Sequence, residues 1–167
     1  MLVPKRILVA TDLGPASAAA LRYGREFGKA FNAQVHVLHV IGDLATGDPV
    51  PPPTYVPEIS NAQSAMVTGA REELHAFVAG IGGPSKTDLI EVVATANGVA
   101  PSILAYAEEQ LIDLIIVGHH GHGGLKQFLL GSVAEKVIRA APCPVLTVRH
   151  PEREFVQPAV LETTAQA

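Results

Sequence analysis

The chain has 167 residues, a net charge of −4 and a hydrophobic content of 48%, which suits one domain with a sizeable core and excludes global disorder. The mild negative charge argues against nucleic-acid binding through phosphate contacts, and no uncharged apolar run is long enough for a transmembrane helix. A single cysteine, Cys143, excludes an internal disulfide framework, and the first apolar stretch is too short for a signal peptide, so we expect a cytoplasmic protein.

Short apolar runs alternate with helix-like segments along the chain. The first run, residues 7–10, has no polar alternation, which is typical of a strand buried on both faces of a parallel sheet. The next segment, 13–31, predicts a helix, because Pro15 suits an early helical position and apolar residues recur on one face. The other expected elements are strands at 35–41, around 90–94, within 113–121 and at 143–150, and helices at 59–83, 99–110 and 131–141.

This alternation of strand and helix predicts an α/β fold. Its parallel sheet is open and five-stranded, with right-handed crossovers and helices on both faces. Ligands bind to such sheets outside the carboxyl ends of the strands, at the point where the strand order reverses. In this chain the relevant ends are Asp12, residues 40–42 and residues 118–122.

Two segments do not belong to the alternation. Residues 42–58 contain too much proline for a helix or an inner strand. They form either a surface loop or a flap over a ligand, because they follow the second strand on the binding side. Residues 150–167 lie beyond the last strand, and we expect a mobile tail there, with a few apolar residues available for docking on a partner chain.

Glycines with a defined spacing join the fourth strand to the fourth helix. Two residues separate Gly118 from Gly121, nine residues separate Gly121 from Gly131, and Ser132 follows. Glycine lets the backbone turn sharply and approach a ligand, while the N–H groups and the dipole of a helix start favour an anion. Ser132 can cap this helix and also donate its hydroxyl to a phosphate. The spacing therefore predicts a phosphate site.

Other phosphate-binding and catalytic motifs do not fit. The nearest stretch to a P-loop, residues 24–30, is one residue short, lacks a Ser or Thr after its lysine and lies inside an expected helix. No Gly-x-Gly-x-x-Gly follows the first strand, as a dinucleotide fold requires. No Gly-x-Ser-x-Gly is present either, so a hydrolase nucleophile elbow is not supported.

Three histidines lie among the glycines. His119, His120 and His122, with or without His39, are a zinc-binding set by residue type. Successive side chains in a glycine-rich turn point in different directions and no cysteine accompanies them, so we prefer imidazoles beside a phosphate and assign no metal site. Lys126 in the same loop either approaches a phosphate or remains exposed.

The spacing Gly118-x-x-Gly121, nine residues, Gly131-Ser132 resembles the ATP-binding signature of the universal stress protein family. The segments "RILVATD" and "GSVAEKVIRAAPCPVLTV" are also similar to that family, so the resemblance covers residues 4–149. It implies a flavodoxin-like fold with strand order 3-2-1-4-5 and one nucleotide-binding domain over residues 1–149. It also implies a homodimer through antiparallel pairing of strand 145–149. His119 departs from the family's commonest form, which has a small hydroxyl residue there.

The resemblance further implies a ligand, which is ATP or another adenine nucleotide, with or without Mg²⁺. It places Asp12 near the ribose and the main chain of Val40 against the adenine, and it places the phosphates at the start of the fourth helix. Asp12 has a structural alternative as a cap of the first helix. The implied nucleotide-binding residues are Asp12, Val40, Val117, Gly118, His120, Gly121, His122, Gly131, Ser132 and Val133.

Three functional hypotheses follow. The first is a homodimeric stress-response regulator that binds ATP. The second is a slow ATPase or nucleotidyl transferase, for which Asp12 is a candidate acid but no obvious second carboxylate completes a magnesium site, so no catalytic residue is assigned. The third is an interaction module in which the dimer surface matters more than the nucleotide. Cys143, between two prolines, is expected to be packed and unreactive.

Overall fold

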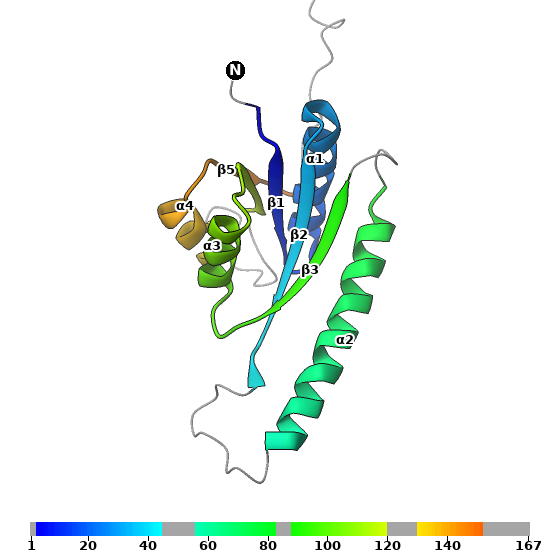
Figure 1. Cartoon of the computed structure of the whole chain (residues 1–167). Coiled ribbons are helices and arrows are strands. Elements are labelled where there is room, and N and C mark those ends of the chain that lie inside the picture. The colour runs from blue at the N-terminus through cyan, green and yellow to red at the C-terminus, as the bar shows by residue number, and fades with distance from the viewer. Residues whose placement is uncertain (1–2, 45–55, 83–87, 120–129, 152–167) are drawn as a thin grey trace, which may run out of the picture.

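The structure, a computed structural model, describes residues 3–44, 56–82, 88–119 and 130–151. Within these residues, five strands form one parallel sheet in the order β3-β2-β1-β4-β5, and four helices connect them (Figure 1). The predicted flavodoxin-like fold and its strand order are confirmed. The strands are β1 (Arg6–Thr11), β2 (Gln34–Ile41), β3 (Leu89–Thr95), β4 (Leu114–Gly118) and β5 (Val145–Val148), and the helices are α1 (Pro15–Phe31), α2 (Val56–Gly80), α3 (Val99–Glu109) and α4 (Ser132–Ala140).

Helices cover both faces of the sheet, and alternate residues of the central strand point to one face or the other. Ile7 and Val9 of β1 belong to the core beneath α1 and α2, whereas Leu8 belongs to the core beneath α3 and α4. All three side chains are 0% exposed. This explains the uninterrupted apolar run at residues 7–10, because a strand between two helical layers needs apolar side chains on both sides.

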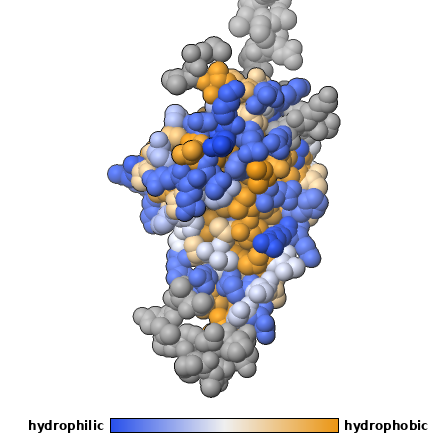
Figure 2. Space-filling model, in the orientation of Figure 1, coloured by the Kyte–Doolittle hydropathy of each residue, from blue (hydrophilic) through white to orange (hydrophobic). Residues whose placement is uncertain are grey.

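The two outer strands of the sheet are β3 and β5. The outer position expected for strand 145–149 is therefore confirmed. On the face seen in Figure 2, apolar surface extends between α3 and α2. On the outer strand β3, Ile90, Val92 and Ala94 are only half-buried. No helix in the described part of the chain is long and apolar enough to cross a membrane.

The start of α2 differs from the prediction. The proline content of residues 42–58 predicts no helix before residue 59, but α2 begins at Val56, so that prediction is wrong for residues 56–58. Pro57 lies in the first helical turn, where a main-chain N–H has no acceptor within the helix, so a proline is tolerated there. Residues 45–55, which contain the rest of the predicted loop or flap, lie outside the described residues. The other element boundaries differ from the expected ones by at most three residues.

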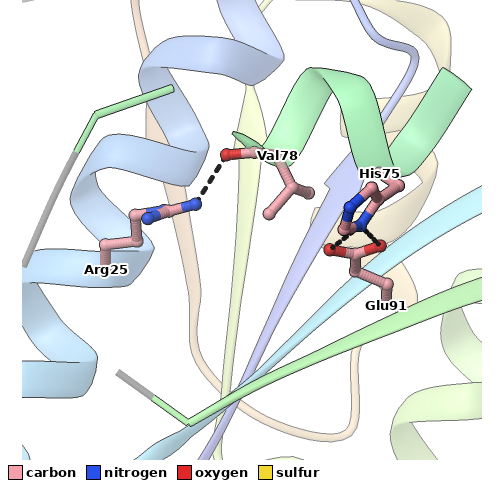
Figure 3. A network of polar contacts seen from close by, with 4 residues as sticks. All are labelled: Arg25, His75, Val78 and Glu91. Carbon is pink, nitrogen blue, oxygen red and sulfur yellow. Dashed lines mark hydrogen bonds and ion pairs between the residues drawn. The ribbon is translucent and has the colours of Figure 1, made fainter. Parts of the chain in front are cut away.

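Two polar contacts hold the carboxyl half of α2 against α1 and the sheet (Figure 3). Arg25 of α1 donates from Nη2 to the main-chain oxygen of Val78, which is 2.6 Å away in the last turn of α2. His75 Nδ1 lies 3.2 Å from Glu91 Oε2 on β3. Since the last turn of α2 contains no basic residue of its own, Arg25 supplies the cation that stabilises this helix end.

Candidate functional site

The carboxyl ends of β1 and β4 meet the start of α4 at one edge of the sheet. The strand order reverses between β1 and β4, which are paired neighbours. Beyond β4, the His119 N–H donates to the Val148 oxygen at 2.7 Å, and the His119 oxygen accepts the N–H of Gly131 at 2.8 Å. The second of these bonds places the start of α4 directly beside the end of β4, at the point where sheets of this topology bind ligands.

The N-terminus of α4 brings main-chain donors to this edge. Gly131 is the N-cap, with φ −61° and ψ 144°, and it has no side chain with which to cap the helix. The hydrogen bond from the Glu135 N–H to the Gly131 oxygen, at 2.9 Å, closes the first turn. The N–H groups of Ser132, Val133 and Ala134 therefore have no acceptor within the helix. Together with the helix dipole, these three donors favour an anion.

Ser132 is the first helical residue and not the cap. The sequence predicts Ser132 as an N-cap that also binds phosphate, and the capping part of that prediction is wrong. Gly131 has the extended backbone that an N-cap requires, whereas Ser132 already lies within the helix. The exposed Ser132 hydroxyl thus stands on the first turn of α4, beside the main-chain donors.

The N-terminus of α1 is occupied by side chains of the protein itself. Asp12 Oδ1 accepts the N–H of Gly14 at 3.0 Å and the hydroxyl of Ser17 at 2.9 Å. Gly14 is the N-cap of α1, so Asp12 contacts the turn before the helix and is not itself the cap. Pro15, the first helical residue, has no N–H to offer a ligand. Asp12 lies at the end of β1, where the sequence analysis places it.

Thr11 stabilises the turn between β1 and α1. Leu13 in this turn has φ 63°, a left-handed conformation that is unfavourable for a residue with a side chain. The Leu13 N–H donates to Thr11 Oγ1 at 2.9 Å, and the Leu13 side chain packs against the core beneath α1. The sequence does not predict this turn, because a leucine does not indicate a left-handed conformation. For the same reason it predicts no role for the polar residues of the turn other than Asp12.

Gly118 allows α1 to pack directly on the end of β4. A Cβ at this position would lie 2.8 Å from the main-chain carbon of Ala16 and 3.0 Å from the Ala16 Cβ. The glycine spacing predicts that Gly118 allows a ligand to approach, and the structure adds a packing reason that holds with or without a ligand. Val117, by contrast, is 3% exposed and its side chain lies in the core, so it can meet a ligand only through its main chain.

β2 contributes His39 and Val40 to the same edge. His39 Nδ1 lies 2.9 Å from the main-chain oxygen of Thr11. Because a carbonyl oxygen only accepts, Nδ1 is the donor of this hydrogen bond. Val40 is half-buried and packs against the core beneath α3 and α4, as does Val133 from the first turn of α4.

Three of the predicted nucleotide-binding residues, His120, Gly121 and His122, lie outside the described residues, and so does Lys126. The zinc alternative shares two of these histidines. Among the residues that the structure describes, no group of three or more His, Cys, Asp or Glu could hold a metal ion. Burial raises the pKa of the Cys143 thiol, and the Asp113 carboxylate acts in the same direction, so this thiol is a poor nucleophile.

Comparisons with known proteins agree with this geometry. The sequence profile of the universal stress protein family matches residues 4–149. A universal stress protein from Methanocaldococcus jannaschii is 32% identical over 150 residues, which are 90% of this chain and 85% of that protein. The solved structure of universal stress protein UspA from Lactobacillus plantarum matches with a TM-score of 0.65 and 26% identity, over 86% of this chain and 97% of that one. A universal stress protein solved in complex with cAMP matches with a TM-score of 0.57 and 22% identity, over 89% of this chain and 98% of that one.

Proposed function

Because the chain belongs to the universal stress protein family, we propose that it binds an adenine nucleotide at the carboxyl edge of its sheet and acts as a stress-response regulator through its nucleotide state. The observation that carries this proposal is the N-terminus of α4, where the N–H groups of Ser132, Val133 and Ala134 lack helical acceptors. The hydrogen bond from Gly131 to His119 holds these donors at the switch point of the sheet.

Each part of the nucleotide has a proposed position. The phosphates lie on the first turn of α4, where the three main-chain donors and the Ser132 hydroxyl can receive them. The ribose lies near Asp12, and the adenine lies against the main chain of Val40 at the end of β2. A protein of similar fold solved in complex with cAMP supports a ligand that contains an adenine and a ribose. The spacing from Gly118 to Ser132, which resembles an ATP-binding signature, favours ATP.

Calorimetric titration of nucleotide-free protein with ATP, AMP and cAMP tests this proposal. We expect saturable one-to-one binding of at least one of them, and weaker binding of GTP if the adenine is recognised. Denaturing freshly purified protein and analysing the supernatant for released nucleotide adds an independent readout. The proposal is rejected if no adenine nucleotide binds at millimolar concentration and none is released.

We also propose that the protein forms a homodimer through β5. This strand is at the edge of the sheet, and its residues are apolar except for Thr147. The oxygens of Pro144 and Val148 accept N–H groups from the β4 side. Since main-chain groups alternate sides along a strand, those of Thr147 face away from β4 and are available to a second copy.

The substitution Thr147→Pro tests the dimer without removing a β4 contact. Proline is tolerated in an edge strand where the N–H faces outward, so the fold should persist while one intersubunit donor is lost. Sedimentation velocity at micromolar concentration should show a dimer for the parent and a shift to monomer for the variant. A monomeric parent would contradict the proposal.

A further inference from the structure

Two buried hydroxyl groups lie beside the Asp12 carboxylate. Ser17 is 3% exposed and Thr11 is 7% exposed, and their side-chain oxygens are 2.9 Å apart. Ser17 Oγ also lies 2.9 Å from Asp12 Oδ1 and 3.0 Å from the Gly14 oxygen. The Ser17 hydroxyl therefore has three oxygen atoms within reach but only one proton to donate.

The contacts of Thr11 indicate where this proton goes. Thr11 Oγ1 already accepts the Leu13 N–H, so its own proton is available for Ser17 Oγ. Ser17 then donates to Asp12 Oδ1, because a hydrogen bond to a carboxylate is stronger than one to a neutral carbonyl. A chain of donors thus runs from the Leu13 N–H through both hydroxyls and ends on Asp12.

These contacts set the orientation of the Asp12 carboxylate. Its Oδ1 accepts the Ser17 hydroxyl and the Gly14 N–H, while the residue itself is exposed at the end of β1. Because Asp12 is exposed at the end of β1, its carboxylate can also accept hydroxyl groups of a ligand, and the two hydroxyls of a ribose are donors of this kind.

We propose that Ser17 is a positioning residue that holds the Asp12 carboxylate in the orientation that accepts the ribose hydroxyls, so that the site selects ribonucleotides over 2′-deoxyribonucleotides. This inference rests on the proposed nucleotide binding. Ser17 acts only through Asp12 and does not itself touch the ligand, since it is buried beneath the turn.

α3 provides a matched control. Like α1, it begins after a glycine N-cap that makes no side-chain cap hydrogen bond. Ser102 in its first turn donates its hydroxyl to the Gly98 oxygen at 2.8 Å, as Ser17 can to Gly14. Within the described residues, however, the Ser102 hydroxyl contacts no carboxylate. Ser102→Ala therefore removes the same kind of local bond without changing the orientation of an acid.

The test compares the dissociation constants of ATP and 2′-deoxyATP for the parent, Ser17→Ala and Ser102→Ala, using nucleotide-free full-length protein. We expect the parent to bind ATP about tenfold or more tightly than 2′-deoxyATP, the size expected for one hydrogen bond to a charged group. Ser17→Ala should lose most of this ratio, mainly through weaker ATP binding, and Ser102→Ala should keep it. An unchanged ratio in Ser17→Ala, or equal binding of both nucleotides by the parent, overturns the inference.

Thr11→Val removes the hydroxyl that donates to Ser17 and changes the shape of the side chain little. This variant replaces Ser17→Ala in the test if Ser17→Ala does not fold. It should also reduce the ratio, and a full ratio in a folded Thr11→Val protein overturns the inference. In an Asp12→Ala background, which removes the carboxylate and its hydrogen bond from Ser17, Ser17→Ala should have no further effect on the ratio. A parent that binds neither nucleotide rejects the proposed function itself, and the inference with it.

Discussion

The N-termini of α1 and α4 lie at the same edge of the sheet and start in the same way, yet they differ in what occupies them. Each helix has a glycine N-cap and no side-chain cap hydrogen bond. At α1, the Asp12 carboxylate accepts from Gly14 and Ser17, and Pro15 removes a donor. The acid in the first turn of α4, Glu135, pairs with Arg139 instead, and among the described residues no carboxylate accepts from the N–H groups at the start of α4. Because a helix N-terminus favours negative charge, α1 stabilises an acid of its own chain, whereas the first-turn donors of α4 are the ones that we propose for a phosphate.

Placing a carboxylate at the N-cap of α4 should have the largest effect. Gly131 has φ −61°, a conformation open to any residue, so Gly131→Asp can place an acid at the N-cap. The new side chain would accept from the first-turn N–H groups and repel phosphate. We expect ATP affinity to fall about 100-fold or more, since hydrogen bonds to charged groups contribute about 1.5–3 kcal/mol each.

Gly131→Asn is the matched control for this substitution, because asparagine caps a helix without the charge. Calorimetry should show a smaller loss of ATP affinity for Asn than for Asp, while the unfolding temperature of either variant equals or exceeds that of the parent. If Gly131→Asp binds ATP as tightly as the parent, the start of α4 is not the phosphate site, and the contrast with α1 has no functional meaning.

The sequence predicts the sheet better than it predicts this contrast. The run 7–10 indicates a strand buried on both faces, because the hydropathy of each residue indicates its own burial. The family resemblance, and not the hydrophobic periodicity, implies the strand order.

A serine near a helix start can be the N-cap or the first helical residue, and the residue type does not distinguish the two. The backbone conformation of Gly131 shows that Ser132 is the first helical residue.

The details of the site that the sequence does not predict depend on segments that come into contact only after folding. Ala16 and Gly118 are far apart in the sequence, and neither residue type predicts that they are in contact. The contact of Ser17 with Asp12 needs the left-handed turn at Leu13, which residue type does not favour. The bulk of the sheet can therefore be predicted residue by residue, whereas the turns that aim polar side chains cannot.

Gly118→Ala tests whether α1 begins in close contact with β4. The added methyl group would lie 2.8 Å from the main chain of Ala16, so α1 or β4 must shift. Overpacking of this kind typically costs about 1–3 kcal/mol, and we expect a loss of about 2 kcal/mol in urea unfolding. Gly42→Ala is the control, since nothing lies within 4 Å of its Cβ position, and it should change stability by no more than about 0.5 kcal/mol. Equal stability of the two variants would contradict the close packing.

A smaller, pH-dependent effect is expected at His36, inside the sheet. Burial lowers the pKa of His36, and Arg6 acts in the same direction while Asp88 opposes it. The ring is held by the Tyr106 hydroxyl at 2.7 Å and by Gln34 Oε1 at 3.0 Å. Below about pH 6.5 the unfolded chain takes up this proton more readily than the folded protein, so stability is present above that pH and is lost as the pH falls.

Urea unfolding of nucleotide-free protein between pH 7.5 and 5 measures this effect. His36 contributes a slope of at most about 1.4 kcal/mol per pH unit, and His36→Asn should flatten the curve in this range, whatever its stability at pH 7.5. A parallel curve for the variant would assign the acid sensitivity to other groups. The result also sets the pH above which a loss of ATP binding in α1 or α4 variants reports on phosphate contacts and not on unfolding.

The smallest effect is expected from removing the charge at α1. In Asp12→Asn the side-chain oxygen still accepts from Gly14 and Ser17, so the turn persists while the charge that interacts with the helix dipole is lost. We expect the nucleotide-free protein to lose about 0.5 kcal/mol of stability at low salt and less at high salt. Gly131→Asp should shift stability the opposite way in the same assay. If both variants shift in the same direction, the charge at Asp12 does not stabilise α1, and the two helix starts differ in hydrogen bonding alone.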